Sequence, residues 1–470
     1  MPTLAPVLAT FLLAAAVPAP EASWDDLAVR LLRQYLQIDT SNPPGNELKG
    51  ALFYKALLER EGIPVLLDEF APGRANLLAT LKGGGARRPL ILANHMDVVP
   101  ADASRWSTPP FSGLLHDGLV YGRGAEDMKT EGILQLLAVL RLKRDAVPLD
   151  RDVLFLATAD EEADFAGALR AISPEGWRER LKDAEFLITE GGENLVEAAG
   201  KPPLYFGVET AEKGPFWLKL RTAGTPGHGS RPIADSAPNR LLRALERIRM
   251  HRTPMKVLPT VEKFFQDQAP RVGPPRAAWY RDMRAALADP AAARVLYEDR
   301  EVSALLRNTI SITVMRAGYK TNVIPGTAEA ELDVRLLPGE DPRAFLAEMR
   351  AVVDDASVEI VPPAVFRPPN QSAVDTELFR VIQEVLGRLF PGVPITTKML
   401  TGATESVLFR PLGIVCYGFT PLLTTAEETA TGHGDDERIA EATVRRSTGI
   451  FYEVVREIAA RRPAAATTAR

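Results

Sequence analysis

Three short apolar segments in the first half of the chain each run directly into acids or a histidine. Residues 90–93, 153–157 and 186–188 show no polar alternation, which is typical of strands buried on both faces of a parallel sheet. Stretches with helical spacing of apolar residues separate them. This alternation predicts an α/β fold with helices on both faces of the sheet. Because such sheets bind ligands at the carboxyl ends of their strands, we expect the site there.

The polar residues at these strand ends suggest metal chemistry. His95 and Asp97 follow the first segment, Glu161 and Glu162 the second, and Glu190 the third. A metal-bound histidine commonly has its second ring nitrogen held by a carboxylate, a role open to Asp97. For this stretch alone, a solvated histidine beside a turn aspartate explains the pattern equally well.

Two more residues extend the pattern. Asp127 stands just before a segment with helical periodicity, and His433 lies in the glycine-flanked loop TGHGDD. Zinc accepts histidine nitrogen and carboxylate oxygen, and paired metals share ligands and a water. We therefore expect two metals bridged by Asp127, with Glu161 as the general base that deprotonates the bridging water. Singly, each acid is explained as well by solvation or helix capping. The expected ligands are His95, Asp127, Glu162, Glu190 and His433; His116 and His251 are left as surface or core residues.

The length of the chain predicts two domains, since 470 residues exceed one comfortable core. A net charge of −5 gives no support to a nucleic-acid surface. The pattern shifts after residue 210 to alternating strands, a Gly/Pro-rich loop and a Pro/Arg-rich stretch, which predicts an inserted α+β domain. We expect residues 23–210 and 365–462 to form the first domain, 211–364 the insertion, and 463–470 a disordered tail.

The first 22 residues resemble a secretory signal peptide, with an apolar stretch and small residues near its end. Export to a periplasm or the exterior is expected if they act as one, and a cytoplasmic location otherwise. No later segment is apolar enough to cross a membrane. The single cysteine, Cys416, excludes an internal disulfide and lies in an apolar run, so a buried strand position is expected rather than a nucleophile.

Six motifs occur in an order that resembles a known family. They are HMDVVP (95–100), YGRGAEDMK (121–129), DEE (160–162), GHGSRP (227–232), TNVIPG (321–326) and GHGDDE (432–437). Together they resemble the di-zinc metallopeptidase and amidohydrolase family of aminoacylase, carboxypeptidase S, glutamate carboxypeptidase and succinyl-diaminopimelate desuccinylase. The resemblance spans about residues 27–457. It implies a zinc-peptidase α/β domain, a ferredoxin-like lid that can form a homodimer, and two zinc ions, with cobalt or manganese as substitutes.

The resemblance also implies residue roles. The five expected ligands match zinc-ligand positions, Asp97 orients His95, and Glu161 takes the position of the base. His228 matches the residue that polarises the scissile carbonyl. Two departures are visible: Thr189 precedes Glu190 where the carboxypeptidase S branch usually has an aspartate, and Glu405 stands where aspartate is commoner. The implied substrate-binding positions are Asn322, Arg335, Gly402 and Thr404.

The expected function is hydrolysis of an amide bond that releases a C-terminal amino acid from a peptide or an N-acyl amino acid. The Pro/Arg-rich stretch resembles the enlarged lid of the carboxypeptidase S and N-acyl-amino-acid hydrolase branch. Alternatives are an aminopeptidase or another deacylase of the same fold, or an inactive relative that only binds amino-acid derivatives. A nonmetal hydrolase is disfavoured, because no Gly-x-Ser-x-Gly elbow or Cys/His pair is evident.

Overall fold

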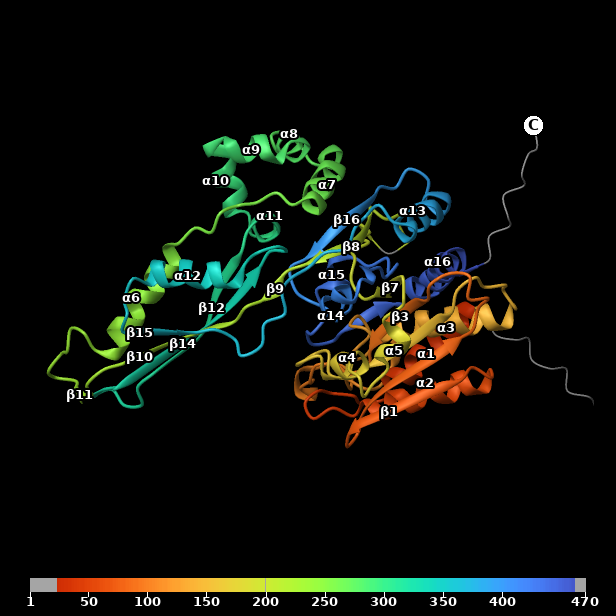
Figure 1. The fold of residues 1–470 in the computed structure, drawn as a ribbon, viewed down its shortest axis with the longest axis horizontal. Coiled ribbons are helices and arrows are strands. Elements are labelled where there is room, and N and C mark those ends of the chain that lie inside the picture. The colour runs from red at the N-terminus through yellow and green to blue at the C-terminus, as the bar shows by residue number, and fades with distance from the viewer. Residues whose placement is uncertain (1–22, 199, 461–470) are drawn as a thin grey trace, which may run out of the picture.

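Two units built on separate sheets make up the protein, and they lie next to each other along its long axis (Figure 1). The computed structural model describes residues 23–198 and 200–460. The expected signal peptide and the expected tail lie outside these described residues. Within them, no helix is both long and apolar enough to cross a membrane.

The larger unit is organised around a mixed sheet of eight strands in the order β1-β2-β6-β3-β7-β17-β8-β16. The central neighbours β6, β3, β7 and β17 are parallel, as are β8 and β16, whereas β1, β2 and the β17–β8 pair are antiparallel. The strands are β1 (Val65–Ala71), β2 (Arg74–Leu81), β3 (Leu90–His95), β6 (Val153–Thr158), β7 (Phe186–Thr189), β8 (Phe206–Glu212), β16 (Ile395–Leu400) and β17 (Val415–Gly418).

Helices cover both faces of this sheet, as the unbroken apolar strands predict. Leu90 and Leu92 of β3 enter one core and Ile91 and Ala93 enter the other, so successive side chains are buried on opposite faces. One face packs on α1 (Trp24–Leu36), α2 (Glu47–Arg60), α3 (Lys129–Arg144), α13 (Glu377–Leu389) and α16 (Glu441–Ala459). The other packs on α4 (Ala166–Ala171), α5 (Arg178–Leu181) and α14 (Ser406–Phe409).

The smaller unit has an antiparallel sheet in the order β12-β14-β10-β15. Chain order is strand, helix, two strands, helix, strand, and the spatial order completes a ferredoxin-like fold. Side chains of β14 alternate between buried and partly buried, and the buried face packs under the two helices. The elements are β10 (Leu218–Ala223), α6 (Ala237–Met250), β12 (Thr309–Ala317), β14 (Thr327–Leu336), α12 (Pro342–Val353) and β15 (Val358–Val361), with β9 (Gly214–Pro215) beside β14.

The Pro/Arg-rich stretch folds into five short helices rather than an extension of the smaller sheet. They share a core with Ala211 and Met399 of the larger unit, and α7 packs on the edge strand β16. This covers an edge that would otherwise offer unpaired backbone groups. The helices are α7 (Pro259–Gln268), α8 (Arg276–Arg281), α9 (Met283–Ala288), α10 (Pro290–Glu298) and α11 (Arg300–Leu306).

Two small strand groups complete the structure. A ribbon of β11 (Gly227–His228) and β13 (Val323–Ile324) extends the smaller unit at its far end (Figure 1). A three-stranded sheet joins β4 (Leu114–His116), β5 (Leu119–Tyr121) and β18 (Arg438–Ala440). The last of these pairings brings the loop after α15 (Ala426–Thr429) beside the turn that precedes α3.

Candidate metal centre and substrate cleft

The expected metal ligands converge at the carboxyl edge of the larger sheet. His95 ends β3, Glu162 lies four residues after β6, and Glu190 directly follows β7. These three strands are parallel neighbours, so their carboxyl ends meet. Asp127 enters from the turn before α3, and His433 from the loop between α15 and β18.

Asp127 lies between two groups of ligand atoms. Its Oδ1 is 3.1 Å from His95 Nε2, which is 3.5 Å from Glu190 Oε2. Its Oδ2 is 3.1 Å from His433 Nε2, which is also 3.1 Å from Glu162 Oε1. Tetrahedral zinc with ligands at 2.0–2.1 Å sets them about 3.3 Å apart. The two groups therefore fit two divalent ions with Asp127 between them.

Charge at this centre favours cations. Burial opposes charge on His95, yet Glu190 and Asp127 outweigh it and raise the pKa of His95 well above its ordinary value. Hydrogen bonds to Asp127 and Glu162 raise the pKa of His433 to about 10. Burial raises the pKa of Glu190 to about 7. The carboxylates thus favour a positive charge at the two histidine rings. Divalent ions can supply that charge in place of the ring protons.

Glu161 lies beside the ligands without belonging to either of the two Asp127 groups. Its carboxylate oxygen lies within 4.8 Å of ligand atoms of His95 and Glu162. Burial, and then Glu190, raise the pKa of Glu161 well above its ordinary value. Nearby divalent ions act in the opposite direction. Because burial raises the pKa of this carboxylate and divalent ions lower it, Glu161 can both accept and release a proton, as a general base must.

Asp97 is fully buried and organises the loop that carries the two glutamates. Its carboxylate accepts hydrogen bonds from the backbone N–H groups of Glu161 at 3.0 Å and Glu162 at 3.1 Å, and from Asn42 Nδ2 at 2.9 Å. Its contact with His95 is mainly through the backbone: Nδ1 of His95 is 3.0 Å from the Asp97 carbonyl oxygen and 3.7 Å from Oδ1. Asp97 therefore positions both the candidate base and one ligand, as well as His95.

A buried ion pair that the sequence reasoning missed joins the two loops of the centre. Arg123 Nη1 lies 2.6 Å from Glu437 Oε2, and both side chains are buried. Glu437 also accepts from the backbone N–H of Asp127 at 3.1 Å, while Arg123 Nη2 donates to the Gly434 carbonyl at 2.9 Å. Both residues stand in the motifs YGRGAEDMK and GHGDDE, but nothing in the sequence alone pairs them. The pair fixes Asp127 relative to the His433 loop.

Three further acids lie beside the centre, and no basic side chain forms an ion pair with them in the described part of the chain. Burial raises the pKa of Glu126, Glu131 and Glu405 to about 8 in each case. Burial thus opposes ionisation of these three carboxyl groups, and cations in the centre act in the opposite direction.

A cleft of about 690 Å³ opens from Glu161 and Glu162 towards the smaller unit. Arg335 of β14 lines it, as does Trp217, whose ring centroid is 5.9 Å from the guanidinium carbon. Arg335 and Asp333 are two residues apart on β14 and therefore share one face of the strand. They form a two-bonded ion pair with N···O distances of 2.7 and 3.1 Å.

Two of the other expected residues, His228 and Asn322, lie at the far end of the smaller unit, whereas Gly402 and Thr404 flank Ala403, which lines the cleft. His228 is exposed on β11 at the far end of the smaller unit, with Nδ1 2.8 Å from Ser230 Oγ. Asn322 is beside it, since its carbonyl accepts from Gly229 N–H at 2.8 Å. Thr404 is buried and donates its hydroxyl to Glu212 at 2.8 Å, and Gly402 lies near Leu400. This structure therefore brings the ligands and Glu161 together, and leaves His228 and Asn322 away from them.

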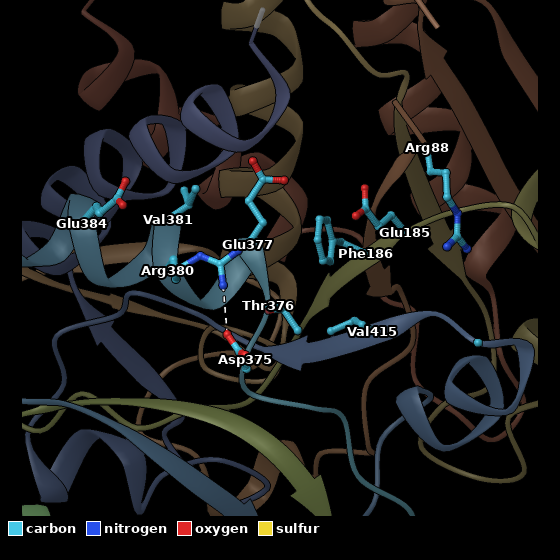
Figure 2. A pocket seen from close by; sticks show the side chains of 11 residues that line it. Arg88, Glu185, Phe186, Asp375, Thr376, Glu377, Arg380, Val381, Glu384 and Val415 are labelled. Carbon is cyan, nitrogen blue, oxygen red and sulfur yellow. Dashed lines mark hydrogen bonds and ion pairs between the residues drawn. The ribbon is translucent and has the colours of Figure 1, made fainter. Parts of the chain in front are cut away.

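A second pocket lies at the opposite edge of the larger sheet, where β7 and β17 begin (Figure 2). It measures about 550 Å³, and charged side chains from several elements line it. Arg380 pairs with Asp375 at 3.0 Å, and Glu377 pairs with Arg87. Arg380 thus has an acidic partner, whereas Arg88 donates to the backbone carbonyls of Asp183 and Ala184 at 3.0 and 2.7 Å. The length of the strands separates this pocket from the candidate metal centre.

Two groups of candidate metal ligands at the carboxyl edge of an α/β sheet, with the half-buried Glu161 beside them, are typical of a metal-dependent hydrolase. The model of Peptidase family M20/M25/M40 matches residues 91–457, and the chain belongs to this family. The resemblance inferred from the six motifs is thereby confirmed.

Relatives and solved structures agree. Human N-fatty-acyl-amino acid synthase/hydrolase PM20D1 is 29% identical over 394 residues, covering 80% of this chain and 76% of the relative. Aminoacylase-1 of Sus scrofa is 26% identical over 436 residues, covering 92% and 95%. The M20 family metallo-carboxypeptidase Sso-CP2 from Sulfolobus solfataricus shares the fold with a TM-score of 0.67 at 19% identity, covering 92% of this chain and 100% of that chain. Bacillus subtilis YXEP, titled a dinuclear metal binding peptidase, has a TM-score of 0.60 at 15% identity, covering 93% and 98%.

Proposed function

We propose that this protein hydrolyses an amide bond and releases a C-terminal amino acid from a peptide or an N-acyl amino acid. Two divalent ions, zinc first and cobalt or manganese as substitutes, are held by His95, Asp127, Glu162, Glu190 and His433. The observation that carries this proposal is the position of Asp127, whose two carboxylate oxygens face two different histidines, each paired with its own glutamate.

The residues around the ions then have distinct roles. When bound, the ions supply Lewis acidity and lower the pKa of water in the site. Glu161 takes the proton of the attacking water and passes it to the leaving amine. Asp97 holds the backbone of Glu161 in place through a 3.0 Å hydrogen bond. Proton transfer by a positioned group of this kind contributes roughly 10²- to 10⁴-fold to rate.

The proposed substrate class rests on the cleft and on the relatives. By their names, the human relative acts on N-fatty-acyl amino acids and the Sulfolobus protein is a carboxypeptidase. We propose that Arg335 contacts the free carboxylate of the substrate. A guanidinium matches a carboxylate in a two-bonded fork, and such contact requires Arg335 to exchange Asp333 for the substrate.

We further propose that the smaller unit acts as a lid. His228 and Asn322 reach the substrate only if the lid closes or if a second copy of the chain supplies them in a homodimer. In either case His228 polarises the scissile carbonyl, Asn322 holds the substrate, and the turn of Gly402 and Thr404 borders the bound substrate.

The test is a hydrolysis screen with the zinc-loaded protein. N-Acyl amino acids, dipeptides and their C-terminal amides are incubated, and free amino acids are measured by mass spectrometry. We expect release from substrates with a free carboxylate and weak release from the amides. Cleavage of dipeptide amides but not of N-acyl amino acids would favour an aminopeptidase. Binding without any turnover would indicate an inactive binding protein, and either result contradicts the proposal.

A further inference from the structure

Several large apolar side chains line the cleft beside Glu161. Phe165 and Leu169 come from the start and middle of α4, Trp217 from the segment between β9 and β10, and Val365 from the segment that returns from β15 to α13. Leu169 is 38% exposed, Trp217 59% and Val365 66%. Large apolar side chains gathered at one concave place mark a binding surface more often than chance exposure does.

Arg367 lines the same cleft as these apolar side chains. Its guanidinium carbon is 5.5 Å from the centroid of the Phe165 ring, and its Nη2 donates to the Asp164 carbonyl at 3.3 Å. Among residues 23–198 and 200–460, no carboxylate forms an ion pair with it. The sequence reasoning did not single it out, because it stands in a loop outside every motif.

The two arginines of the cleft thus differ in their ion pairing. Arg335 with Asp333 is neutral overall, and a substrate carboxylate must displace Asp333 to bind there. Arg367 forms no ion pair within the described residues, so its two-bonded fork is available to a substrate carboxylate, and the acids Glu161, Glu162 and Asp164 line the same cleft.

We propose that Arg367 binds the free carboxylate of the substrate and that Phe165, Leu169, Trp217 and Val365 pack against the side chain of the same amino acid. Both groups are attached to one Cα atom, so they occupy adjoining parts of one subsite. The preferred leaving amino acid is then apolar. This inference rests on the proposed amide hydrolysis, to which it adds the recognition group and the kind of amino acid released. Arg335 remains a second contact, reached after exchange of Asp333.

The first experiment measures kcat/KM for an N-acyl leucine and for its amide. Wild type, Arg367→Ala, Arg367→Lys and Arg335→Ala are compared, and each variant is checked for melting temperature and metal content. Arg178→Ala is the matched control, because Arg178 also donates to a backbone carbonyl at 3.3 Å but lies outside the cleft. We expect Arg367→Ala to lose roughly 10- to 100-fold in preference for the acid, as for a lost charge-assisted hydrogen bond. Arg367→Lys retains part of the preference, since it keeps charge but not the fork.

The second experiment compares N-acetyl phenylalanine with N-acetyl glycine on wild type and Trp217→Ala. We expect wild type to prefer phenylalanine by at least about tenfold, the size expected for burying an aromatic group. Trp217→Ala should lose much of that preference.

The outcomes distinguish a failure of this inference from a failure of the proposed amide hydrolysis. If wild type hydrolyses N-acyl amino acids and Arg367→Ala keeps the full preference for the acid, the role of Arg367 is wrong while the hydrolase remains. Equal turnover of phenylalanine and glycine derivatives overturns the apolar subsite in the same way. If wild type releases no amino acid from any of these compounds, the proposed function itself fails, and the inference with it.

Discussion

Replacement of Glu161 by glutamine tests the proposed proton transfer. Glutamine keeps the shape of the side chain but cannot accept a proton at neutral pH. The backbone of residue 161 stays anchored to Asp97 by its 3.0 Å hydrogen bond, so the loop should keep its position. We therefore expect kcat to fall by roughly 10²- to 10⁴-fold, which is about 2.7–5.5 kcal/mol of transition-state stabilisation.

The assay is steady-state kinetics on an N-acyl amino acid, together with metal content and melting temperature. Glu161→Gln should keep both ions, because Glu161 is not among the five proposed ligands. Glu162→Gln should instead lose affinity for one ion, since Glu162 lies 3.1 Å from His433. Glu175→Gln, an exposed acid outside the cleft, is the control for loss of one carboxylate. Near-normal turnover by Glu161→Gln would falsify the assignment of the base.

Three more predictions concern Asp97 and Glu437, which position residues of the candidate metal centre, and Cys416. Asp97→Asn, by weakening the hold on the 161–162 loop, should reduce kcat or metal affinity about 10- to 100-fold; unchanged kinetics and metal titration would refute this. Glu437→Gln leaves Arg123 with a buried unpaired charge and should destabilise folding by about 3–5 kcal/mol, measured by denaturant unfolding, where an unshifted midpoint would contradict it. Burial raises the pKa of the Cys416 thiol to about 12, so at pH 8 only about one thiol in 10⁴ is a thiolate. A thiol reagent should thus label Cys416 only after unfolding, and fast labelling of the native protein would speak against its burial.

The sequence predicted the layout of the larger unit because its signals are local. Apolar segments such as 90–93 have no polar alternation, which is typical of strands buried on both faces, and both faces are indeed covered. The predicted buried position of Cys416 in β17 is also confirmed. His95, Glu162 and Glu190 lie at or just after the carboxyl ends of neighbouring parallel strands, so the positions of the strands in the sequence are enough to group them.

What could not be predicted depends on contacts between distant segments. Asp97 was expected to hold His95 through its carboxylate, but the shorter contact is through its backbone carbonyl. The ion pair of Arg123 and Glu437 joins positions 314 residues apart, and neither residue has a local pattern that reveals a partner. Arg367 stands in a loop without periodicity. The distance of His228 from the metal ligands follows from the relative position of two units, for which no local sequence pattern exists.

The central claim is that two divalent ions are bound by two groups of residues that share Asp127. Metal content per chain, measured by elemental analysis before and after exhaustive chelation and alongside hydrolysis rates, tests it most directly. We expect about two ions per chain in wild type and about one in His433→Ala, which loses a ligand from one group only. Chelation should abolish hydrolysis, and zinc, cobalt or manganese should restore it. Full hydrolysis by protein from which no metal can be detected would contradict the account.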